Sequence, residues 1–151
     1  MEPQHIKKTV VRQHDASDCG VACLLSIIQF HGGVGSLENL RRLSGTTKTG
    51  TTLLGLYQCA EKVGFDTKGA DGTLEELQKQ TVPVILHIET EEQLQHYVVY
   101  FGMHENNFVV GDPAQGVVHY TQKELELLWK SKKCLLLEPN KAFIKLSLIH
   151  I

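Results

Sequence analysis

The sequence predicts an α+β domain, because apolar residues follow helical spacing in its first half and form β-branched or aromatic runs in its second half. The chain has 151 residues, a length that suits one domain. A hydrophobic content of 42% and a net charge of −2 exclude a disordered chain, which buries too little apolar surface to fold.

The clearest helix lies between residues 18 and 31 and begins at Cys19. Its apolar residues recur every three or four positions, and the pair Gly32-Gly33 ends the pattern. Residues 1–12 are expected to form an arm that ends in a short extended segment. Three shorter helices are expected after the first one: at 36–43, at 52–61, and from residue 73 to a point before Pro83.

Strands are expected after Pro83, where the spacing of apolar residues changes. Runs of β-branched and aromatic residues alternate there with polar, Gly or Asn clusters, at 84–87, 97–101, 108–110 and 117–120. A helix from residue 121 to about 129 and a last strand at 134–137 complete the order. The second half is therefore expected to form an antiparallel sheet, with the helical half preceding it.

Cys19 is the candidate nucleophile, because it stands in the first turn of the clearest helix. Backbone N–H groups at that end have no partner within the helix, and the helix dipole favours a thiolate there. The alternative is that Cys19 is a small buried apolar residue. Two neighbours favour the chemical interpretation: Gln13 can direct an amide at the oxygen of an attacked carbonyl, and Gly20 lets a substrate backbone approach. Asp18 is expected to cap the helix.

A thiolate nucleophile needs a base and a group that orients the base. His96 precedes the strand at 97–101, and Asp112 follows the strand at 108–110, so the two can lie on adjacent strands of one hairpin. A turn centred near His104 places residues 96 and 112 opposite each other. A tight turn at 106–107 places Val117 opposite His96 instead, and the sequence leaves both registers open.

Three segments in order resemble one known family: Gln13-x5-Cys19-Gly20-x-Ala22-Cys23-Leu24, then His96-Tyr97-Val98-Val99, then Gly111-Asp112-Pro113. They are similar to the double-glycine leader peptidases, which are the N-terminal domains of peptidase-containing ABC transporters. The similarity extends over about residues 6–138. It implies a papain-like cysteine peptidase fold, in which an N-terminal helical half packs on a C-terminal antiparallel sheet.

The same resemblance implies the reaction and the roles of the residues. Cys19 would be the nucleophile, His96 the general base and acid, Asp112 the orienting group and Gln13 the donor in the oxyanion hole. The enzyme would remove the leader of a bacteriocin or a similar ribosomal peptide by cutting after a Gly-Gly pair, through a thioester intermediate. A groove that takes an amphipathic leader helix is expected among the Leu-rich helices of residues 36–64.

The resemblance also implies partners and a location. The partners are the leader peptide and the membrane and nucleotide-binding domains of an ABC transporter, in the same full-length chain. The fragment is expected to be soluble and to work on the cytoplasmic side of the bacterial membrane. We assign residues 1–140 to the peptidase domain and 141–151 to an apolar tail or the start of a linker, which suggests that the chain is cut from a longer protein.

Other function classes find little support. No Lys/Arg run is longer than a pair, so nucleic acid is not expected as a partner. Cys19 and Cys23 are four residues apart with His14 and His31 nearby, but no second pair of ligands follows, so we expect neither a metal nor a cofactor. No apolar segment is long enough for a signal peptide or a spanning helix.

Three alternatives to a peptidase stay open. A binding module that only holds substrate for transport would lack the thiol, yet Cys19 is present. A thiol-dependent acyl transferase or isopeptidase would accept an amine in place of water. A plain interaction domain would keep Cys19, His96 and Asp112 apart, and the structure can test this third alternative directly.

Overall fold

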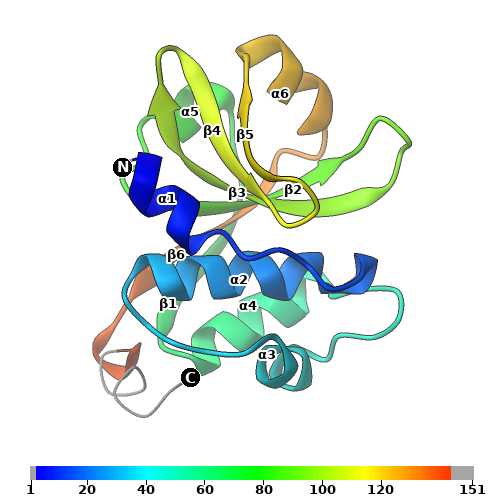
Figure 1. The fold of residues 1–151 in the computed structure, drawn as a ribbon, viewed down its shortest axis with the longest axis vertical. Coiled ribbons are helices and arrows are strands. Elements are labelled where there is room, and N and C mark those ends of the chain that lie inside the picture. The colour runs from blue at the N-terminus through cyan, green and yellow to red at the C-terminus, as the bar shows by residue number, and fades with distance from the viewer. Residues whose placement is uncertain (1–2, 144–151) are drawn as a thin grey trace.

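The computed structural model describes residues 3–143, and these form a twisted antiparallel sheet with helices on both faces (Figure 1). Six strands lie in the order β1-β6-β2-β3-β4-β5. Their bounds are β1 Phe65–Asp71, β2 Val84–Glu89, β3 Gln95–His104, β4 Asn107–Asp112, β5 Gly116–Tyr120 and β6 Lys133–Pro139. The expectation of an α+β domain with a helical first half and an antiparallel sheet is confirmed.

The helices divide between the two faces of the sheet. One face is covered by α1 Pro3–Thr9, α2 Cys19–Phe30, α3 Leu37–Ser44 and α4 Leu53–Lys62, with a 3₁₀ turn, η1 Ala16–Asp18, directly before α2. The other face is covered by α5 Leu74–Gln78 and α6 Gln122–Leu128. Two separate apolar cores result, one on each side of the sheet. No helix within residues 3–143 is long and apolar enough to cross a membrane.

Two segments differ from the sequence-based expectations. The arm expected at 1–12 contains the helix α1, because Ile6 and Thr9 lie three residues apart and bury one side of it. The sequence does not predict the strand β1. Phe65 is its only buried residue, and the other residues follow no alternating pattern. Pairing with β6 along its whole length specifies β1 instead. Most of the apolar tail expected at 141–151 lies outside the described residues.

The hairpin of β3 and β4 has a register that neither of the two expected turns gives. The turn is Glu105-Asn106, both with positive φ, and it pairs His104 with Asn107. Further along, Phe101 has no partner, because Tyr100 pairs with Val110 and Gly102 with Val109. This β-bulge shifts all pairs beyond it by one residue.

The bulge decides which face of the sheet Asp112 occupies. Val99 pairs with Gly111, so the continued register places Asp112 opposite Val98, two residues from His96 and on the same face. Without the extra residue, the turn would place Asp112 opposite Val99, with its side chain on the other face. The pairing of His96 with Asp112 therefore depends on one inserted residue in β3.

Candidate active site

Cys19 is the first residue of α2, as the sequence predicts. Asp15 stabilises the preceding turn, since its carboxylate accepts a hydrogen bond from Ser17 N at 2.9 Å. The first ten residues of α2, Cys19 to Ile28, are all buried, which fixes the helix against the sheet. Cys19 itself is 6% exposed, so its thiol lies at the edge of the core. Asp18 precedes α2, but its side chain makes no capping hydrogen bond, contrary to the expected cap.

His96 and Asp112 form a buried pair. His96 Nε2 lies 2.7 Å from Asp112 Oδ1, and Asp112 is 2% exposed. Two further donors hold the carboxylate: Ala114 N bonds to Oδ1 at 2.8 Å, and Gln115 Nε2 bonds to Oδ2 at 2.9 Å. The part played by Gln115 is not visible in the sequence, because a Gln in a loop has no distinguishing pattern.

The Cys19 thiol completes a line of three groups, since it contacts the imidazole of His96. Because Nε2 of His96 is bonded to Asp112, Nδ1 is the ring nitrogen available to the sulfur. The structure thus brings together the three residues that the sequence singled out. The alternative of an interaction domain, in which these residues never meet, is contradicted.

The surroundings favour a charged imidazole. Burial by itself lowers the pKa of His96, but the hydrogen bonds to Asp112 and Cys19, with the charges of both, raise the pKa to about 9. Burial raises the pKa of Asp112, yet the hydrogen bonds from His96 and Ala114 N outweigh it, and the pKa is lowered. A site with these properties can hold an imidazolium beside a thiolate near neutral pH.

Gln13 is held near this pair through its backbone. Gln13 N donates to Pro113 O at 2.9 Å, so the loop before α2 is tied to the residue after Asp112. Its side-chain Oε1 is buried and has no hydrogen-bond partner within residues 3–143. The side chain is half-buried beside the turn that carries Asp112.

Tyr97 joins the site to the loop between α3 and α4. Its hydroxyl donates to Thr51 O at 3.0 Å, and burial together with the charge of Cys19 raises the pKa of Tyr97 to about 12. The hydroxyl therefore stays a neutral donor at physiological pH. This contact joins residues that are far apart in the chain, so the sequence does not reveal it.

The other three cysteines differ from Cys19 in their surroundings. All four are free and buried. Burial raises the pKa of Cys23 and of Cys134, and it raises the pKa of Cys59 to about 11. None of these three contacts an imidazole in the way that Cys19 does, within the part of the chain that the structure describes.

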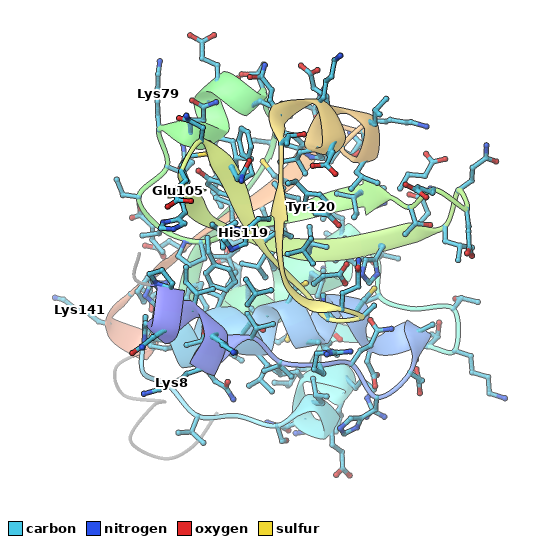
Figure 2. The ribbon with its side chains drawn as sticks, turned by 45° about the horizontal axis from the view of Figure 1, so that its top comes forward. Lys8, Lys79, Glu105, His119, Tyr120 and Lys141 are labelled. Carbon is cyan, nitrogen blue, oxygen red and sulfur yellow. The ribbon has the colours of Figure 1, made fainter. Side chains whose placement is uncertain are left out.

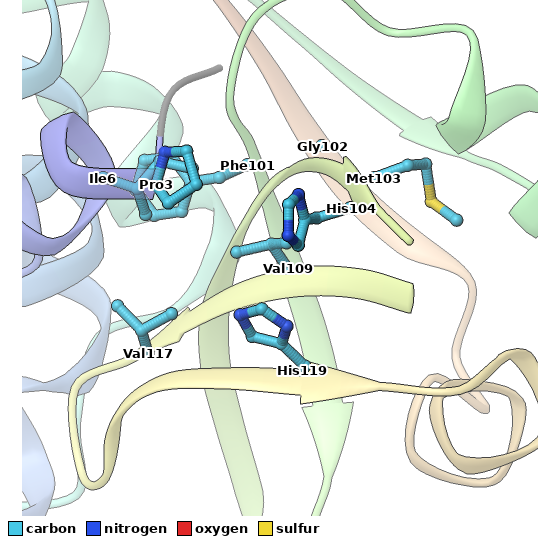
Figure 3. A pocket seen from close by; sticks show the side chains of 9 residues that line it. All are labelled: Pro3, Ile6, Phe101, Gly102, Met103, His104, Val109, Val117 and His119. Atoms are coloured by element: carbon cyan, nitrogen blue, oxygen red, sulfur yellow. The ribbon is translucent and has the colours of Figure 1, made fainter. Parts of the chain in front are cut away.

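A small pocket between α1 and the sheet does not belong to this site. It measures about 30 Å³, enough for a water molecule or two. Figure 3 shows its lining, with the rings of His104 and His119 on β3 and β5. Their centroids are 6.0 Å apart. No group of three or more His, Cys, Asp or Glu side chains within residues 3–143 could hold a metal ion.

Comparison with known proteins places this geometry in a family. The model of the peptidase C39 family matches residues 7–142, nearly the whole described fold. The chain belongs to the peptidase C39 family. C39 is a family of cysteine peptidases, so the predicted enzyme class and the resemblance to the leader peptidases are confirmed.

Related sequences come from transporters of bacteria. The lactococcin-G-processing and transport ATP-binding protein of Lactococcus lactis subsp. lactis is 37% identical over 125 residues, which are 81% of this chain and 18% of that protein. The transport/processing ATP-binding protein ComA of Streptococcus pneumoniae is 41% identical over 107 residues, 70% of this chain and 15% of that protein. The chain thus spans less than a fifth of the length of these relatives.

Solved structures confirm the papain-like fold. The peptidase domain of Streptococcus ComA superposes with a TM-score of 0.80 at 34% identity, covering 86% of this chain and 97% of that one. A double glycine motif protease from an AMS/PCAT transporter, in complex with a leader peptide, superposes with a TM-score of 0.79 at 27% identity. That match covers 87% of this chain and 91% of the protease.

Proposed function

We propose that this C39 domain removes the leader from a ribosomal peptide, a bacteriocin or a similar product, by cutting after a Gly-Gly pair. The observation that carries the proposal is the His96–Asp112 hydrogen bond, with His96 also in contact with Cys19 at the start of α2. The relatives process and transport peptides, and one matched structure is a double glycine motif protease with a leader peptide bound.

The geometry supports a thioester mechanism. Cys19 sulfur attacks the carbonyl carbon of the second glycine, and Gln13 with a backbone N–H stabilises the oxygen that becomes negative. His96 gives its proton to the amine as the C–N bond breaks, so the core peptide leaves and the leader stays on sulfur. His96 then takes a proton from a water molecule that attacks the thioester, which frees the leader and regenerates the thiol. Asp112 keeps the imidazole oriented throughout.

We propose that the domain acts on the cytoplasmic side of the membrane, within a transporter that exports the freed peptide. The partners would be the membrane and nucleotide-binding domains of an ABC transporter in one chain, as the names of the relatives suggest. In this arrangement residues 1–140 form the peptidase domain, and 141–151 lead toward the transporter.

The preference for glycine at both positions is supported by the comparison, since one matched structure is a double glycine motif protease with a leader peptide bound. Gly20 does not supply this preference, because a Cβ placed on it would lie 3.1 Å from Cδ1 of Leu56, a fully buried side chain of the core.

The test is cleavage of matched leader peptides that end in Gly-Gly, Ala-Gly or Gly-Ala, followed by mass spectrometry. We expect the reduced protein to cut only the first peptide, after its second glycine, and Cys19→Ala to give no product. Equal cleavage of the three peptides would reject the specificity, and cleavage by Cys19→Ala would reject the nucleophile.

Leader recognition has a separate test. We propose that the apolar side of a leader helix lies on the α3–α4 region, where Leu54 is 64% exposed. A hollow of about 310 Å³ lies between α6 and the loop that follows β2, next to Tyr120, which is labelled in Figure 2. It is less suited because Glu89, Glu91 and Glu124 line it.

Two exposed leucines make a matched pair of variants for this choice. Leu127 lines the acidic hollow and is 69% exposed, close to the exposure of Leu54. Titration of a labelled leader into the Cys19→Ala protein should show weaker binding when Leu54→Glu is added and unchanged binding with Leu127→Glu. The reverse result would show that the leader binds at the hollow between α6 and the loop after β2, rather than on the α3–α4 region.

A further inference from the structure

Asp18 is a buried carboxylate directly before the nucleophile. It is 0% exposed, although aspartate is rarely so fully buried without a partner. Its Oδ1 lies 2.9 Å from Nε of Arg41 on α3, as an ion pair whose N–H is not aligned for a hydrogen bond. Its Oδ2 has no hydrogen-bond partner among residues 3–143. A helix cap would explain the position of Asp18, but the side chain caps nothing.

A negative charge at this position opposes the chemistry next to it. A thiolate at Cys19 is stabilised by positive charge and destabilised by a neighbouring carboxylate. Burial makes the repulsion stronger, because little water separates the two groups. Some counter-charge must therefore accompany Asp18 if Cys19 is to ionise.

The groups that face Cys19 come from several elements. His96 and Tyr97 on β3 and Cys23 on α2 interact with Cys19, and Asp112 on β4 interacts with His96 and Cys23. Asp18, with its partner Arg41 of α3, is the residue before Cys19 in the chain, and the exposed Asp15 of the preceding loop interacts with Arg41. The helix α4 contributes an apolar side chain, Leu56, at Gly20. The helix α1 meets the other end of α2, where His5 bonds to Phe30 O.

Two buried carboxylates thus lie near Cys19, one on the residue before it in the chain and one bonded to His96, and each has its own cation. Asp112 is matched by the imidazole of His96, and Asp18 is matched by the guanidinium of Arg41. The proposed mechanism uses the first pair and gives the second pair no part. The second pair is nevertheless built into the turn from which Cys19 projects.

The backbone around Arg41 is fixed. Its carbonyl accepts hydrogen bonds from Gly45 N at the end of α3 and from Thr46 N at 3.2 Å. Thr46 in turn bonds through its hydroxyl to Thr51, whose carbonyl receives the Tyr97 hydroxyl. The base of the Arg41 side chain therefore belongs to the same bonded loop that contacts β3 beside His96.

We propose that Arg41 is a positioning residue for the nucleophile. Its guanidinium holds the Asp18 carboxylate, which fixes the turn before α2 and cancels the negative charge beside the Cys19 thiolate. The inference rests on the proposed role of Cys19 as the nucleophile. It adds a residue from α3, a helix that contributes no group to the mechanism above.

The test measures how the rate of Cys19 alkylation by iodoacetamide depends on pH, with Cys19→Ala as the blank. Arg41→Gln should move the pH of half-maximal rate upward by about one unit, because a buried carboxylate is left without its cation. The matched control is Arg42→Gln, since Arg42 is the next residue and bonds to Asn39 rather than to Asp18. Arg42→Gln should leave the profile unchanged.

Two further variants distinguish charge from folding. Asp18→Asn should move the half-maximal pH downward, because Arg41 then has no carboxylate to neutralise, and the double variant Asp18→Asn/Arg41→Gln should return it close to the original value. These two variants bury no unpaired carboxylate, so they remain informative even if Arg41→Gln does not fold. An Arg41→Gln profile equal to that of Arg42→Gln, or an Asp18→Asn profile equal to the wild type, would overturn the proposal.

Failure of the proposed function would give a different result. Cleavage of the Gly-Gly leader by Cys19→Ala would show that Cys19 is not the nucleophile. If Cys19→Ala is inactive but Arg41→Gln and Asp18→Asn leave the alkylation profile unchanged, only the positioning role of Arg41 is rejected. The role of Cys19 as the nucleophile is then kept.

Discussion

Replacing Asp112 by Asn tests how strongly the carboxylate controls the active pair. The substitution keeps the shape of the side chain but removes the charge that faces His96 Nε2 at 2.7 Å. With Asp112 in place, the pKa of His96 is about 9, against 6.5 for an unperturbed imidazole. That difference corresponds to roughly 3 kcal/mol in favour of the imidazolium.

The magnitude at a working pH follows from these values. At about pH 7.5, an imidazole with a pKa near 9 is more than about nine-tenths protonated, whereas one at 6.5 or below is about one-tenth protonated. In Asp112→Asn, burial, which lowers the pKa of His96, is opposed only by the hydrogen bond and charge of Cys19. We expect kcat/KM for a Gly-Gly leader to fall at least about tenfold, and toward about 10⁴-fold if the imidazole also loses its orientation.

The assay is the pH profile of both cleavage and Cys19 alkylation. In the wild type, the imidazolium is present below pH 9 and is lost as the pH rises through about 9, so cleavage should fall there, whereas alkylation, which needs only the thiolate, should not. In Asp112→Asn this upper limb of the cleavage profile should move to lower pH, because the hydrogen bond and charge of Asp112 no longer raise the pKa of His96. Gln115→Ala is the control, because it removes one donor to Asp112 and leaves the carboxylate in place. A limb that stays near 9 in Asp112→Asn, with cleavage within threefold of the wild type, would refute the reasoning.

Three further results are expected. Cys19 should be alkylated by iodoacetamide far faster near neutral pH than the other three cysteines, whose pKa values are raised by burial, and equal labelling in a peptide map would contradict this. Gly55→Ala should lower the free energy of unfolding by about 1–3 kcal/mol in urea titrations, because the new Cβ would lie 2.5 Å from Ser44 O; an equally stable variant would show that α4 shifts freely. Tyr97→Phe should cost about 1–3 kcal/mol in thermal unfolding, since Thr51 O loses its donor, and no change in Tm would show that this bond contributes nothing.

The sequence predicts the elements of the site better than their register. The start of α2 at Cys19 is visible in the chain, because the spacing of apolar residues and the Gly32-Gly33 stop are local signals. The candidates His96 and Asp112 are visible as polar residues at the ends of two strands. Their alignment is not, because it depends on the bulge at Phe101 rather than on the turn.

That bulge has a tertiary cause. Phe101 packs in the core beneath α2, and a Cβ on Gly111 would lie 2.7 Å from its ring. The ring of Phe101 and Gly111 come into contact only when β3 and β4 pair, so no short-range sequence pattern predicts the bulge. The Asp18–Arg41 pair escaped the sequence for a related reason, since it joins a turn to a helix that lies more than twenty residues away in the chain.

The strand order has a consequence for how the domain folds during its synthesis on the ribosome. β6 comes late in the chain, yet it lies between β1 and β2 and supplies Leu135 and Leu137 to the core under α2. Until Pro139 has left the exit tunnel, both neighbouring strands keep an open edge and that core is incomplete. We therefore expect the contact between Cys19 and His96 to form only after β6 has joined the sheet, so that the domain would have no peptidase activity before β6 is synthesised.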